Sequence, residues 1–308
     1  VREFTFLQSE KGLIAQQTLK NGTKILMETV PHTRTVSVGF WFLHGSRDET
    51  GEELGMSHFL EHMLFKGTRN LSSLEIVKTI DRVGGILNAF TEKEQTCFYC
   101  TIASKHTDLA IKLLAEMTFH SILPESEIER ERTVIQNEID EVEDIPEEKA
   151  FDLFLKKIWG DHPLARRITG EIDTIKGFTR ENLFEFYRKW YIPENLIVSI
   201  AGDIDFDSVI SVIEKELPEG RSERQSYERS HPVSRISEDY IASHFQQVQI
   251  ITGISFSIPD TIEEFYHFLV FSTIVGESMS SRLFQSIREQ KGLCYSVQAM
   301  RTFFSSTA

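Results

Sequence analysis

Apolar and polar residues alternate along several stretches of the chain with the two-residue period of β-strands whose two faces meet different surroundings. The dipeptide Asn21-Gly22 between the first two stretches is a strong signal for a tight hairpin turn. The alternation predicts six strands, at residues 13–19, 24–30, 35–43, 86–90, 96–104 and 196–201.

Between these strands, apolar residues recur at the three- and four-residue spacing of amphipathic helices. Ser72 and Glu75 stand at capping-box spacing, and Gly84-Gly85 ends the helix that they begin. The spacing predicts seven helices, at residues 55–68, 72–84, 108–119, 125–143, 148–159, 180–190 and 206–217. We therefore expect an α+β protein whose first domain, residues 1–218, is a mainly antiparallel sheet packed with helices.

The segment 219–235 is rich in Arg, Glu and Ser and poor in apolar residues, which predicts an interdomain linker. Beyond it, residues 236–308 form a second domain of the same sheet-and-helix type. A domain of about seventy residues is small beside a first domain of over two hundred, so we expect it to be truncated. The pattern there predicts strands at 247–256 and 293–300 and helices at 263–275 and 280–290.

Composition argues against some classes of function. A net charge of −14 over 308 residues argues against nucleic-acid binding, which needs a basic surface. No apolar run is long enough to span a membrane, and the start Val1-Arg2-Glu3-Phe4 lacks the layout of a signal peptide. From these two observations we expect the cytoplasm, and the odd number of cysteines, three, suits a reducing compartment. Cys97 and Cys100 lie in a predicted strand, where we expect them to be packing residues.

The predicted helix at 55–68 carries the candidate chemistry. His58 and His62 are four residues apart, so they project from one face and can share a metal ion. Glu61 lies near that face, within reach of a water in an open coordination position. The order H-x-x-E-H is the layout of a catalytic zinc site, although an ordinary half-buried helix can also carry it. Glu131 and Glu138, seven residues apart on the helix at 125–143, share a face and could point at a common site.

These features together resemble the pitrilysin and insulysin (M16) family of zinc peptidases, especially the short-chain branch that includes mitochondrial processing peptidase and its bacterial relatives. The resemblance implies LuxS/metallohydrolase-like domains and one Zn2+ per chain. The matching segments are Asn21-Gly22, Gly45-Ser46-Arg47-Asp48-Glu49, residues 55–68, residues 84–91, Glu131 with Glu138, Ser280-Ser281-Arg282-Leu283, and Arg288 with Tyr295.

The resemblance also implies roles for individual residues. It implies that the zinc ligands are His58, His62 and Glu138, that the general base acting on the water is Glu61, and that an additional essential carboxylate is Glu131. Glu131 or Glu141 remains an alternative to Glu138 as the third ligand, because sequence alone does not determine the register of the helix.

Two further pairs are implied to contact substrate. Asn88 and Ala89 match the edge-strand segment that pairs with an extended peptide, a mode that reads backbone more than side chains. Arg288 and Tyr295 match a pair that stabilises the oxyanion near the scissile carbonyl. That pair comes from the half opposite the zinc in this family. We therefore expect a homodimer in which each subunit supplies Arg288 and Tyr295 to its partner.

The resulting expectation is a zinc metalloendopeptidase that hydrolyses short or unfolded peptides. Two alternatives remain. One is a non-catalytic scaffold subunit of a heteromeric complex, against which the intact H-x-x-E-H motif argues. The other is one subunit of a heterodimeric protease, which co-purification of a different chain would support.

Overall fold

The computed structural model describes residues 5–8, 13–220, 229–236, 238–242, 245–257, 259 and 261–307. The chain forms two compact units. The first takes in the described residues up to 220 and those of 238–250, and the second takes in those of 229–236 and from 251 onward. Within the predicted linker at 219–235, residues 221–228 lie outside the described residues.

The first unit contains a seven-stranded sheet in the order β1-β2-β3-β7-β4-β6-β5. Every neighbouring pair in it is antiparallel except β3 and β7, so the mainly antiparallel sheet is confirmed. All six predicted strands are present. The seventh strand, β1, was not predicted, because its short segment shows no clear alternation. The strands are β1 Thr5–Gln8, β2 Leu13–Thr18, β3 Lys24–Thr29, β4 Thr35–Phe42, β5 Ile86–Thr91, β6 Thr96–Ala103 and β7 Leu196–Gly202.

The sheet buries one face, as β4 illustrates. Val36, Val38, Phe40 and Phe42 all point to the core and are almost fully buried. The intervening residues face the other side, where Trp41 Nε1 donates a hydrogen bond of 2.8 Å to Ser199 Oγ of β7. A one-residue slip would exchange these two sets, so the alternation in the sequence determines the register of the strand.

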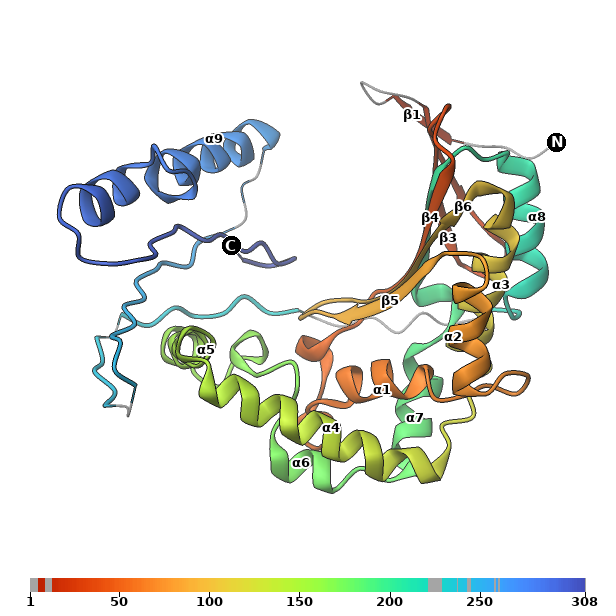
Figure 1. The fold of residues 1–308 in the computed structure, drawn as a ribbon, viewed down its shortest axis with the longest axis horizontal. Helices are drawn as coiled ribbons and strands as arrows, with labels where there is room; N and C mark the ends of the chain where they lie inside the picture. Colours follow the sequence, from red (N-terminus) through yellow and green to blue (C-terminus); the bar gives the residue numbers. More distant parts are fainter. Residues whose placement is uncertain are drawn as a thin grey trace. The chain divides into compact units, whose positions relative to one another are not determined.

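Helices cover the buried face of the sheet (Figure 1). α3 packs against β4 and β6 with α8 beside it, and α1 contacts β5, α4 and α7. The seven predicted helices are all present, but the first ends at Leu64 rather than at residue 68, and α6 had not been predicted. The helices are α1 Met56–Leu64, α2 Ser73–Asp81, α3 Thr107–Phe119, α4 Glu125–Asp144, α5 Pro146–Trp159, α6 Ile172–Lys176, α7 Arg180–Trp190 and α8 Phe206–Glu216.

The second unit contains α9, Ile262–Ser272, which continues into π-helical turns at Thr273–Glu277, and a further π-helical segment at Phe284–Glu289. The two predicted helices are thus present, in part as π-helix. The predicted strands at 247–256 and 293–300 are wrong, because no described residues form a hydrogen-bonded ladder with either segment. A strand needs such a neighbour to satisfy its backbone.

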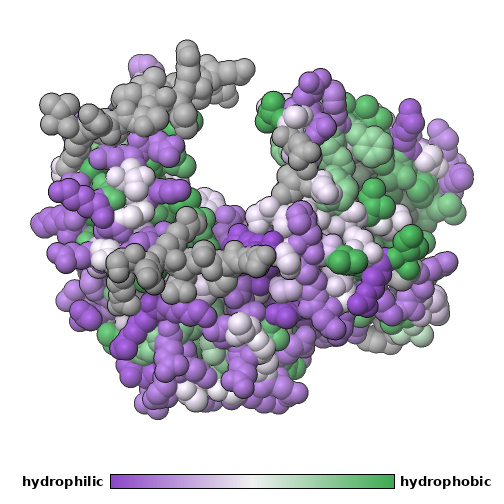
Figure 2. Space-filling view, turned by 180° about the vertical axis from the view of Figure 1, so that it is seen from behind, coloured by the Kyte–Doolittle hydropathy of each residue, from purple (hydrophilic) through white to green (hydrophobic). Residues whose placement is uncertain are grey.

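Apolar side chains gather on the surface of the second unit (Figure 2). On α9 and the turn after it, the exposed ones are Ile262, Tyr266, Val270, Phe271 and Ile274. None of the described helices has both the length and the apolar character required to cross a bilayer.

Candidate metal centre

The start of α1 is held by the carboxyl group of a residue in the preceding loop. Glu49 Oε2 accepts a hydrogen bond from the Gly55 amide and Oε1 accepts one from the Ser57 amide, both at 2.8 Å. These two amides belong to the first turn of the helix, which has no partners of its own for them. Gly55 adopts φ 95°, a conformation that favours glycine. Sequence patterns assign no chemical role to Glu49, and this contact supplies one.

The apolar residues of α1 decide which way the two histidines point. Its core-facing residues are fully or almost fully buried: Met56, Phe59, Leu60, Met63 and Leu64. The helix is therefore held by that face, and His58, Glu61 and His62 occupy the half-buried remainder.

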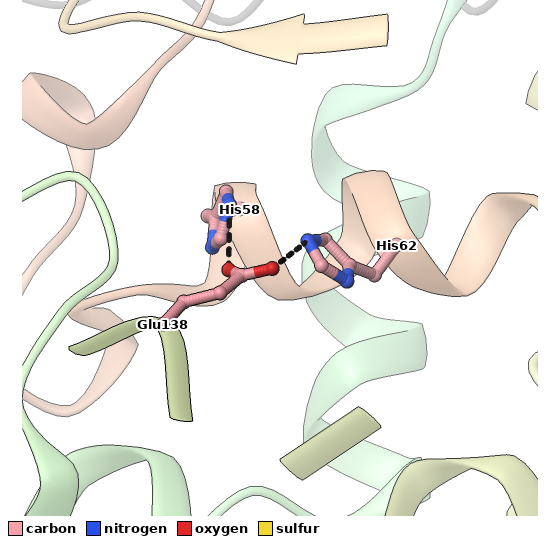
Figure 3. Close-up of side chains that lie close together, drawn as sticks. All are labelled: His58, His62 and Glu138. Atoms are coloured by element: carbon pink, nitrogen blue, oxygen red, sulfur yellow. Dashed lines mark ion pairs between the residues drawn. The ribbon is translucent and has the colours of Figure 1, made fainter. Parts of the chain in front are cut away.

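Two imidazoles and one carboxylate converge at this surface. Glu138, from α4, lies between the two rings (Figure 3). Its Oε2 is 3.7 Å from His58 Nε2 and its Oε1 is 3.7 Å from His62 Nε2. One potential ligand atom from each residue lies within 4.8 Å of the other two. The three residues that the resemblance names as ligands are thus brought together from two helices.

Glu131 contacts the same cluster through the other ring nitrogen of His62. Its side chain is almost fully buried, and its Oε2 lies 3.0 Å from His62 Nδ1. Its other oxygen pairs with Lys66 Nζ at 2.6 Å. A carboxylate in this position accepts the Nδ1 proton and leaves the Nε2 lone pair directed at the cluster. Glu141, the remaining alternative for the third ligand, is exposed and is not part of the cluster.

The donor set fits Zn2+. Imidazole nitrogen and carboxylate oxygen are typical zinc ligands, and bond lengths of about 2.0–2.2 Å place tetrahedral ligand atoms roughly 3.4 Å apart. The two nitrogen–oxygen separations of 3.7 Å, one to each oxygen of Glu138, are close to that spacing. Burial, and secondarily His62, lowers the pKa of His58 to about 4. His58 is therefore neutral at physiological pH, which is the form that binds metal.

Glu61 lies beside the cluster without joining it. Burial raises the pKa of its carboxyl group, and a hydrogen bond from Thr91 opposes that rise. Thr91 Oγ1 donates this bond to Glu61 Oε2 at 2.6 Å. Sequence reasoning missed Lys66 and Thr91 as well as Glu49. All three stand inside or beside the matched segments, but only the folded structure shows which atoms they contact.

The residues implied to contact substrate fall in both units. Asn88 and Ala89 lie in β5, an edge strand that has β6 on one side and no described strand on the other. Arg288 and Tyr295 lie in the second unit, where the Arg288 guanidinium carbon is 5.3 Å from the centre of the Tyr295 ring. Tyr295 is 88% exposed. The two members of each pair are thus neighbours.

Comparison with known proteins identifies the family of the chain. Residues 24–171 match the model of insulinase (peptidase family M16), and residues 177–306 match that of the peptidase M16 inactive domain. The uncharacterized zinc protease YmxG of Bacillus subtilis is 36% identical over 295 residues, covering 96% of this chain and 72% of the relative. The chain belongs to the M16 peptidase family. Another relative, the uncharacterized zinc protease ML0855 of Mycobacterium leprae, is 34% identical over 299 residues, covering 96% of this chain and 67% of the relative.

Solved structures agree on the M16 fold. A protease from Helicobacter pylori superimposes with a TM-score of 0.78 at 24% identity, covering 91% of this chain and 69% of that one. A peptidase M16 inactive domain from Pseudomonas fluorescens gives 0.77 at 18% identity, covering 92% of this chain and 70% of that one. At these identities the likeness concerns the fold alone.

Proposed function

We propose that this M16 family member is a zinc-dependent endopeptidase that hydrolyses short or unfolded peptides. The observation that carries the proposal is the convergence of His58, His62 and Glu138, with the Glu61 carboxylate beside them. One Zn2+ per chain would be held by these three residues. When bound, the metal would polarise the substrate carbonyl and make water more acidic.

The residues of this chain carry the proton transfers. Glu61 takes a proton from the attacking water and delivers it to the leaving amine. A carboxyl group whose pKa is raised by burial is better matched to this exchange near neutral pH than a fully solvated one. Glu131 holds His62 in the tautomer whose Nε2 lone pair would be available to the metal.

The edge strand β5 supports a peptide as the substrate. An extended chain can add to the edge that has no described partner, next to Asn88 and Ala89. Backbone pairing of this kind requires an extended, unfolded segment and tolerates many side chains. The proposal therefore includes broad specificity for unfolded peptides.

The competing function, a non-catalytic scaffold, draws support from the name of the second matching domain. That model covers residues 177–306, and the metal cluster lies entirely outside this range. The name therefore does not extend to the segment that carries His58, Glu61, His62 and Glu138. The argument for catalysis rests on that segment.

Substitution of Glu61 tests the function. Glu61→Gln keeps the shape of the side chain and all three metal ligands but removes the base. We expect unchanged zinc content and loss of cleavage of a quenched peptide by a factor of 100 or more, on the order expected for a missing general base. Glu52→Gln, an exposed position before α1, is the matched control. Full activity in Glu61→Gln would contradict the mechanism, and zinc-free wild type would favour the scaffold.

We further propose a homodimer in which Arg288 and Tyr295 of each subunit complete the site of the other. The pair is adjacent in the second unit, and one chain carries both it and the metal cluster. Mixing Arg288→Ala subunits with Glu61→Gln subunits should restore part of the activity, because one site in a mixed dimer is intact. Mixtures that remain inactive while mixed dimers form would contradict the shared site.

A further inference from the structure

The hydroxyl group of Thr91 makes the only hydrogen bond that the described residues offer to the Glu61 carboxylate. Thr91 Oγ1 donates to Oε2 at 2.6 Å. Thr91 is the last residue of β5, the edge strand, whereas Glu61 lies on α1. The contact therefore links two elements: the strand that we expect to bind the peptide, and the helix that carries the general base.

We propose that Thr91 is a positioning residue that fixes the catalytic orientation of Glu61, an inference that rests on the proposed peptidase function. With Oε2 held by the hydroxyl group, Oε1 is the oxygen left to take the proton from water. A glutamate has three rotatable side-chain bonds, and a short hydrogen bond to a charged oxygen selects among its rotamers.

The end of β5 is itself anchored, so Thr91 can act as a fixed support. The turn that follows it is tied to the loop before α1: the Ser46 amide donates to the Glu92 carbonyl at 3.1 Å and the Arg47 amide donates to the Lys93 carbonyl at 2.7 Å. A side chain on Gly45 would come within 2.3 Å of the Glu92 carbonyl oxygen, so the two segments are in close contact.

The same loop holds α1 through Glu49, which accepts from the Gly55 and Ser57 amides. The strand end and the helix start are thus attached to one loop. Relative movement of Thr91 and Glu61 is limited at both ends, and a position held to within about half an ångström is what efficient proton transfer requires.

Three variants separate the hydroxyl group from the shape of the side chain. Thr91→Val keeps the β-branched shape suited to a strand, Thr91→Ser keeps the hydroxyl group, and Thr91→Ala removes both. We expect Thr91→Val and Thr91→Ala to lower kcat by about 10- to 100-fold, the loss that follows from one hydrogen bond to a charged group, with KM within about twofold. Thr91→Ser should recover most of kcat.

The matched control is Thr101→Val. Thr101 is a threonine of the adjacent strand β6, and its hydroxyl group pairs with Ser37 at 3.0 Å. It lies opposite Ile86, at the other end of the β5–β6 ladder from Thr91. Its removal should leave kcat and KM unchanged. Zinc affinity, measured by competition with a chelator, should be the same in all Thr91 variants because no ligand is altered.

Two readouts distinguish positioning from a general structural effect. Adding Thr91→Val to Glu61→Gln should lower the residual rate no further, because Thr91 acts through Glu61. A crystal structure of metal-free Thr91→Val should show the Glu61 carboxylate displaced from the position that it has in the wild type. An undisplaced carboxylate would contradict the proposal.

Kinetic measurements can also contradict the role of Thr91 without contradicting the proposed function. An active wild type with an unchanged kcat in Thr91→Val, a loss that Thr91→Ser fails to recover, or a rise in KM alone would contradict the role of Thr91. An inactive zinc-loaded wild type or a fully active Glu61→Gln variant would instead overturn the peptidase function on which the inference rests.

Discussion

Glu131 and His62 form a contact of 3.0 Å between a nearly fully buried carboxylate oxygen and the Nδ1 atom of the imidazole ring. The Nε2 atom of the same ring faces Glu138. A partner on the far nitrogen fixes the tautomer of a metal-binding histidine, and its loss typically costs 10- to 100-fold in metal affinity.

Glu131→Ala should therefore weaken zinc binding by about 10- to 100-fold, as measured by competition with a chelator. Glu131→Gln keeps an acceptor oxygen for Nδ1 and should lose less. Glu129→Gln on the same helix is the control, because Glu129 is exposed and pairs only with Arg132 among the described residues. Equal affinity in Glu131→Ala and the wild type would show that His62 needs no support from this residue.

The third ligand is tested by comparing two carboxylates of α4. Glu138→Gln replaces a carboxylate whose two oxygens each face one imidazole with an amide, a poor zinc ligand, so zinc content should fall well below one per chain. Glu141→Gln should retain full zinc content because Glu141 is exposed outside the cluster. Elemental analysis after dialysis measures both. The reverse pattern would shift the ligand assignment one turn along the helix.

The sequence predicts the metal cluster well where short spacing decides the geometry. A separation of four residues puts His58 and His62 on one face of a helix, and a separation of seven does the same for Glu131 and Glu138. The resemblance named Glu138 as the ligand, but spacing alone does not distinguish which of the two glutamates meets Nε2 and which meets Nδ1. That choice depends on how α4 packs against α1, which is a tertiary contact.

The fold likewise divides into features that local patterns predict and features that tertiary packing decides. Alternation located six strands, but it could not place β7 between β3 and β4, because strand neighbours far apart in sequence are selected by packing. The patterns at 247–256 and 293–300 predict strands, but no ladder among the described residues satisfies the backbones of these two segments. The contact of Thr91 with Glu61 likewise joins a strand end to a helix and leaves no pattern in the sequence.

Gly55 tests how strictly the start of α1 is determined. Its φ of 95° is unfavourable for a residue with a side chain, and an added Cβ would lie 2.7 Å from the Thr169 carbonyl oxygen. Gly55→Ala should lower the free energy of unfolding of the metal-free protein by on the order of 2–4 kcal/mol, as measured by denaturant titration.

Gly51→Ala is the matched control for Gly55→Ala. Gly51 lies in the same loop, and an added Cβ there would meet no atom within 4 Å. Its unfolding free energy should stay within about 0.5 kcal/mol of the wild type. A small effect at Gly55 would mean that the loop moves to accept a side chain, and that the left-handed turn is not needed to begin the helix.

Glu49 makes stability depend on pH. Burial raises the pKa of its carboxyl group from 4.5 to about 8, outweighing the hydrogen bonds from Gly55 and Ser57 that lower it. Between these two values the folded protein retains a proton that the unfolded chain has released. The contribution of Glu49 to stability is therefore complete below about pH 4.5, falls as the pH rises to 8, and then levels off, a change of up to about 5 kcal/mol.

Glu49→Gln isolates this contribution, because glutamine is neutral at every pH and still accepts a hydrogen bond at the start of α1. The unfolding free energy of the wild type minus that of Glu49→Gln should decrease steadily from about pH 5 to about pH 7. Denaturant titrations of both metal-free proteins in this range avoid the window above pH 8, because burial lowers the pKa of Lys93 to about 8 and that residue titrates there too. A difference that is constant with pH would mean that Glu49 is ionised in the folded protein, held by the two amides and the helix dipole against the cost of burial.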